Sequence, residues 1–87
     1  MKERTHAVEY FYRLMGDLAA LEALRGHNAH GPHNSFHEAH SVLREEFDEL
    51  WEEVKRREPD MGKIEREATQ VAAMAIRMAA MARRHRQ

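Results

Sequence analysis

Apolar residues recur at intervals of three and four along three separate stretches of this chain, and that spacing constrains its fold more than any other feature. Such spacing gathers apolar side chains on one face of an α-helix, whereas a half-buried strand needs alternation with a period of two. No useful length of the chain alternates in that way. The pattern therefore predicts an all-α protein, a three-helix protomer without a sheet.

Two breaks set the expected helix boundaries. The first helix is predicted over about residues 5–25, with Gly26 ending it, because glycine adopts the left-handed conformation at a helix C-terminus without steric cost. The second begins with residues 35–38, Ser-Phe-His-Glu, a capping box in which the serine hydroxyl caps one backbone amide and the glutamate reaches back to another; it ends before Pro59. The third starts near Asp60, a good N-cap, and continues to the arginine-rich C-terminus. The short link predicts that the last two helices form an antiparallel hairpin.

The length of the chain bears on its assembly. It has 87 residues, for which we expect a single domain spanning residues 1–87. A chain of this size leaves much of its apolar surface uncovered, and 43% of its residues are hydrophobic. We therefore expect the protomers to associate, as a homodimer or a tetramer, into an oligomeric helical bundle.

Composition excludes several classes of function. The chain has no cysteine, so disulfides, thiolate metal sites and cysteine nucleophiles are ruled out. Its 14 basic and 15 acidic residues nearly balance, which gives no electrostatic case for a nucleic-acid partner. The sequence shows neither an apolar signal region nor a run able to span a bilayer, so we expect no membrane partner and a cytoplasmic location.

The second predicted helix carries a dense run of carboxylates, and their role depends on the direction in which each points. A helical wheel assigns three of them to the side opposite the apolar stripe, where they are interpreted as solvating charge: Glu45, Asp48 and Glu52. Three others follow one flank of the stripe and can look into a groove between helices: Glu46, Glu49 and Glu53. Of the second set, Glu46 lies nearest to the stripe and Glu49 furthest from it.

The third predicted helix offers ligands at a matching height. Glu67 lies at the edge of its apolar stripe, with Gln70 further round the same flank. In an antiparallel hairpin Glu49 and Glu67 stand at similar distances from the turn, so three or four oxygen ligands can meet there. Carboxylates held together repel one another unless a cation neutralises them, and oxygen ligands without cysteine suit Mg²⁺ or Mn²⁺. On spacing alone, a solvated flank remains the alternative.

Residues 34–54 resemble the first catalytic helix of MazG-like nucleoside triphosphate pyrophosphohydrolases, and residues 67–77 resemble the helix that follows it. That family carries ExxE on one helix and ExxD on the next, which bind Mg²⁺ for hydrolysis of a nucleoside triphosphate to the monophosphate and pyrophosphate. The resemblance implies that Glu46 and Glu49 are catalytic residues and metal ligands. It also implies metal ligation by Glu67 and by Gln70, which stands in place of the aspartate.

Further residues are candidates for contacts with the phosphates of a substrate. Asn34 and His37 lie near the N-terminus of the second helix, where free amides and the helix dipole favour anions. Lys55, Lys63 and Arg77 are cations that can contact phosphates. For all five, the alternative is an ordinary exposed polar residue.

Two other functions stay open. Gln70 offers an oxygen ligand but no negative charge, so the chain can instead be a weak or inactive member of that family that binds a nucleotide or a protein partner. Gln70→Asp is then expected to raise turnover if a latent catalytic site exists. Five histidines lie between His27 and His40, and His37 shares a helix face with His40, which is the pattern of a transition-metal site.

Overall fold

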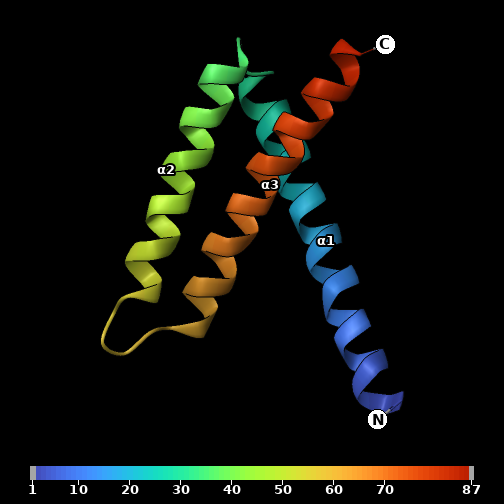
Figure 1. Ribbon diagram of the computed structural model, residues 1–87, viewed down its shortest axis with the longest axis vertical. Coiled ribbons are helices and arrows are strands. Elements are labelled where there is room, and N and C mark those ends of the chain that lie inside the picture. Colours follow the sequence, from blue (N-terminus) through green and yellow to red (C-terminus); the bar gives the residue numbers. More distant parts are fainter. Residues whose placement is uncertain (1, 87) are drawn as a thin grey trace.

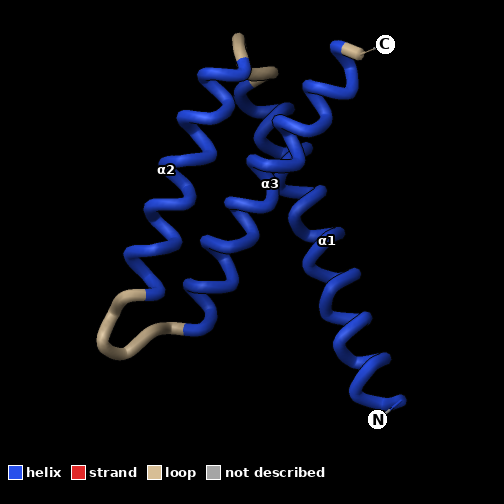
Figure 2. The backbone as a smooth tube through the Cα atoms, in the orientation of Figure 1, coloured by secondary structure: helices blue, strands red, loops and turns tan. Residues whose placement is uncertain are grey.

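The computed structural model describes the backbone of residues 2–86 and the side chains of residues 6–86. It contains three helices (Figure 1): α1 (Lys2–His30), α2 (Phe36–Val54) and α3 (Met61–His85). Figure 2 shows these helices joined by short loops, and no strand occurs in residues 2–86, which confirms the predicted all-α class. Over the same residues, none of the helices has a stretch long and apolar enough to cross a lipid bilayer.

The C-terminal end of α1 corrects the prediction. The helix does not end at Gly26 but continues to His30, and Gly31, with φ 74°, adopts the left-handed conformation at its end. The Gly31 amide donates to the His27 carbonyl at 2.7 Å, as is common at such a helix end. Gly26 serves packing instead. A Cβ at this position would lie 3.1 Å from Nη1 of Arg77, so the missing side chain makes room for that guanidinium.

The starts of α2 and α3 largely follow the prediction. Ser35 is the N-cap of α2, and its hydroxyl accepts a hydrogen bond from the Glu38 amide at 3.0 Å. Asp60 caps α3 in the same way, through a bond from the Lys63 amide at 3.2 Å. The second half of the expected capping box differs, because the Glu38 carboxylate accepts hydrogen bonds from the backbone and side-chain amides of Asn34.

As predicted, α2 ends before Pro59, and its last residue is Val54. Residues 55–58 are all charged, so no apolar side chain is available to hold another helical turn against α3. Pro59 disfavours helical geometry in the residue before it as well. In Figure 1 the chain descends through α2, turns in this segment and ascends through α3, and the two helices are in contact.

The core is small and centres on α3, which packs against both α1 and α2. Ala73 is fully buried and forms a cluster with Ala23 of α1 and with Met74. Val42 and Leu43 of α2 pack against this cluster. Because the spacing between packed helices depends on the side chains at their contact, alanines let the backbones approach closely.

Much of the large apolar surface is uncovered in the single chain. The exposed side chains include several from the stripe that the sequence predicts for the first helix, and others from α2: Val8, Phe11, Tyr12, Leu21, Leu24, Phe47 and Trp51. The face that α1 buries is therefore not its large apolar stripe, but the one that carries the small residues Ala19 and Ala23.

Candidate metal centre

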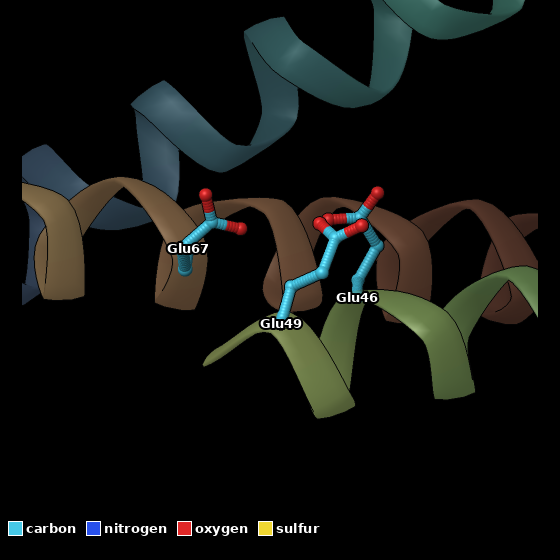
Figure 3. A group of neighbouring side chains, drawn as sticks. All are labelled: Glu46, Glu49 and Glu67. Carbon is cyan, nitrogen blue, oxygen red and sulfur yellow. The ribbon is translucent and has the colours of Figure 1, made fainter. Parts of the chain in front are cut away.

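Three glutamates from two helices come together between α2 and α3. Glu46 and Glu49 extend from α2 and Glu67 from α3 (Figure 3), and one carboxylate oxygen of each lies within 4.8 Å of the other two. Among the side chains of residues 6–86, this is the one group of at least three histidines and carboxylates placed closely enough to share a metal ion. Three of the four predicted metal ligands therefore converge.

The helical wheel of α2 explains which carboxylates take part. Glu46 is half-buried, while Glu49, further from the apolar stripe, is exposed. The carboxylates interpreted as solvating charge are indeed exposed: Glu45, Asp48 and Glu52. Glu53 follows the same flank as Glu46 but lies outside the cluster, where its carboxylate pairs with Arg56 at 3.1 Å.

The electrostatics of the cluster centre on Glu46. Burial raises the pKa of this carboxyl above its ordinary value, and the neighbouring carboxylates of Glu49, Glu67 and Glu45 raise it further. The donor set consists of carboxylate oxygens, which suit a hard divalent cation such as Mg²⁺ or Mn²⁺. Such a cation would offset the repulsion at Glu46. The residues present therefore fit the metal that the sequence predicts.

Gln70, the fourth predicted ligand, contacts a residue that the sequence analysis did not single out. Its side-chain amide donates to the Glu22 carboxylate of α1 at 3.0 Å, in a partly buried contact. Because the nitrogen is engaged, the amide oxygen is the atom left to ligate a metal. The signal for Glu22 was its place beside the small residues Ala19, Ala23 and Gly26, which share the packed face of α1.

A pocket of about 470 Å³ adjoins the cluster and is lined by residues of all three helices. Glu46 and Gln70 line it together with Glu22. Arg77 and His33 line the same pocket, and the Arg77 guanidinium brings positive charge to it. The volume falls within the range of about 300–1,000 Å³ that is usual for small-molecule sites. One carboxylate of the cluster, Glu46, and the Arg77 guanidinium thus line the same pocket.

The predicted phosphate contacts lie elsewhere, apart from Arg77. Asn34 and His37 line a separate hollow at the start of α2, and the Asn34 side chain is bonded to Glu38. Lys55 pairs with Glu52 at 2.9 Å and is not among the residues that line the pocket beside Glu46. Lys63 is exposed and does not line that pocket either. Their roles stay predictions.

The histidines do not gather into a metal site within the described side chains. His37 and His40 share an exposed face of α2 and line a shallow hollow with Ser41, but no third ligand joins them. His33 is the exception in being half-buried, and burial, followed by the nearby Arg77 guanidinium, lowers the pKa of its imidazole, while Glu38 acts in the opposite sense. Among the described side chains, the group of three possible metal ligands therefore consists of carboxylates and not of imidazoles.

No family model matches this chain, and neither a curated protein nor a solved structure is significantly similar to it. The resemblance to MazG-like proteins rests on the motif residues alone and stays a prediction.

Proposed function

We propose that this chain is a Mg²⁺-dependent nucleoside triphosphate pyrophosphohydrolase that acts in the cytoplasm and also accepts Mn²⁺. One observation carries the proposal: Glu46, Glu49 and Glu67 each bring a carboxylate oxygen within 4.8 Å of the others. Two of them come from one helix and the third from another, at positions that match the motif of that family. The adjoining pocket has room for a small phosphorylated ligand.

The chemistry divides between the metal and the side chains. When bound, Mg²⁺ supplies positive charge that offsets the charge on the phosphoryl oxygens. Glu46, Glu49 and Glu67 hold the metal, with the Gln70 amide oxygen assisting. Either Glu46 or Glu49 accepts a proton from the attacking water. The water oxygen bonds to the α-phosphorus, the bond from that phosphorus to the α–β bridging oxygen breaks, and pyrophosphate leaves with the electron pair.

The proposal includes an assembly. We propose that α2 and α3 act as an antiparallel hairpin and that two or four copies pair into a helical bundle through their exposed apolar side chains. Phe11 and Trp51 are 59% and 56% exposed, and a partner that covers such large apolar side chains would remove their surface from water, which is favourable. A second copy of this chain can cover these side chains without any other protein.

A second candidate function is a catalytically weak or inactive relative that binds a nucleotide or a protein partner. The contact between Gln70 and Glu22 favours it, because the position of the expected aspartate holds a neutral amide already bonded to another side chain. This candidate predicts metal or nucleotide binding without turnover.

Pyrophosphate release separates the two functions. We would measure it from a panel of standard and modified nucleoside triphosphates, with Mg²⁺ or Mn²⁺, for the unaltered chain, Glu49→Ala and Glu45→Ala. Glu45 is the matched control, because it is an exposed glutamate of the same helix outside the cluster. The enzyme predicts release that Glu49→Ala abolishes and Glu45→Ala retains, with the same oligomer in all three. Absence of release across the panel, with metal or nucleotide binding retained, would favour the binding protein.

A further inference from the structure

The pocket beside the carboxylate cluster contains an arginine held in place from the side of α1. Arg77 extends from α3 and is half-buried. Its Nη2 donates to the Gly31 carbonyl at 2.7 Å, and its Nη1 lies where a Cβ at Gly26 would come within 3.1 Å. The Gly31 carbonyl, directly after α1, therefore holds the guanidinium, and Gly26 leaves the space that it occupies. A flexible surface arginine would lose far more side-chain entropy on binding a ligand.

Arg77 has no carboxylate partner among the described side chains. None of the ion pairs within residues 6–86 includes it, whereas Arg25, which lines the same pocket, pairs with Glu22 at 2.7 Å. A guanidinium carries several N–H donors, and the structure shows a bond from one of its nitrogens to Gly31. A partly buried cation without a counter-ion has paid part of its desolvation cost, so an anion that reaches it binds more strongly than at the surface.

The pocket is thus lined by the positive Arg77 and by Glu46 of the carboxylate cluster. A chain of phosphates can contact the arginine directly and the cluster through a bound metal. We propose that Arg77 anchors the oligophosphate of the ligand through charge-assisted hydrogen bonds, while the carboxylate cluster acts on the same oligophosphate through its metal. The assignment rests on the proposed function for the role of the cluster. Arg77 itself binds phosphate oxygens whether or not the metal is present, and that difference gives the test.

Inorganic pyrophosphate is the probe, titrated by calorimetry in the presence of Mg²⁺ and, separately, of EDTA. We expect Arg77→Gln to weaken binding at least about tenfold in both conditions, as the loss of a charge-assisted hydrogen bond predicts. Arg77→Lys, which keeps the charge but not the planar donors, should retain more of the affinity. Glu49→Ala should weaken binding only in Mg²⁺. Arg44→Gln is the control, since Arg44 is exposed and does not line the pocket.

Arg77→Gln also removes the hydrogen bond to the Gly31 carbonyl and can unfold the chain for that reason. A second measurement therefore uses the unaltered chain. Pyrophosphate in EDTA should shift the backbone amide NMR signals of Gly26 and Gly31 and leave that of Gly16, which lies far along α1, in place. Undiminished affinity in a folded Arg77→Gln variant, binding without shifts at Gly26 and Gly31, or no binding at all would overturn the inference. Failure of the enzyme proposal is distinct: pyrophosphate would bind through Arg77, but no nucleotide would be hydrolysed.

Discussion

The two halves of α1 bury their side chains to different extents. In the C-terminal half Ala19 and Ala23 are 2% and 7% exposed, whereas in the N-terminal half Phe11 and Tyr12 are 59% and 76% exposed. Figure 1 shows the N-terminal half extending away from α2. Within α1, small residues therefore mark where the chain packs on itself. The exposed large apolar residues of α1 mark the surface that we assign to a second copy.

The largest expected effect is on the stability of the fold, at the place where α3 packs against α1 and α2. Ala73→Leu adds a branched side chain at a fully buried position between helices, and overpacking of this kind costs about 1–3 kcal/mol of a total stability of about 5–15 kcal/mol. We expect a lower midpoint of thermal unfolding, followed by circular dichroism. Ala75→Leu, at an exposed position of the same helix, is the control. Equal unfolding temperatures of the two variants would show that Ala73 does not lie in a packed contact between helices.

The exposed half of α1 should respond in assembly rather than in folding of the protomer. We expect Phe11→Asp to raise the dissociation constant of the oligomer by about tenfold to a hundredfold, because burying a phenylalanine contributes about 1.5–3 kcal/mol. Analytical ultracentrifugation over a concentration series measures it. His6→Asp places the same charge on an exposed polar position of this half. An unaltered chain that remains monomeric at every concentration would contradict the assignment of this surface.

The same contrast shows what sequence can predict in this protein. Helical class, the caps at Ser35 and Asp60 and the flank of Glu46 follow from spacing within a few residues, and the structure confirms them. Two features that the sequence did not predict involve partners distant in sequence. Gln70 and Glu22 are 48 residues apart, and the arginine that makes glycine useful at position 26 is supplied by α3. The sequence alone does not distinguish a glycine that ends a helix from one that leaves space for a side chain of another helix.

Glu22, in the packed half of α1, changes what a substitution at Gln70 should do. Gln70→Asp was expected from the sequence to raise turnover, but it removes the N–H that binds Glu22 and sets two carboxylates near each other. We expect Gln70→Glu to destabilise the fold and Glu22→Gln/Gln70→Glu to recover it, since the swap restores one amide and one carboxylate of equal length. A double-mutant cycle in urea unfolding should give a coupling of about 0.5–3 kcal/mol. Additive effects would show that the two side chains do not interact.

The smallest expected effect concerns Glu46, where the sign depends on the metal. The raised pKa of Glu46 means that the folded state holds this proton more tightly than the unfolded state does. Without divalent cations, its contribution therefore becomes unfavourable as pH rises through the pKa of the unfolded and then the folded state, and stays so above it. Glu46→Gln removes that contribution, so in EDTA the variant should unfold at a higher temperature than the unaltered chain at neutral pH.

The difference between the two chains is the informative quantity, because other carboxylates titrate in the same range. It should be small at low pH, grow as Glu46 ionises and then level off. Asp48→Asn, at an exposed carboxylate outside the cluster, should show no such growth. Added Mg²⁺ should raise the unfolding temperature of the unaltered chain and of Asp48→Asn more than that of Glu46→Gln, since only the first two keep all three carboxylates. Equal Mg²⁺ responses in all three would place the metal elsewhere, and the packed half of α1 would then border a pocket without a metal centre.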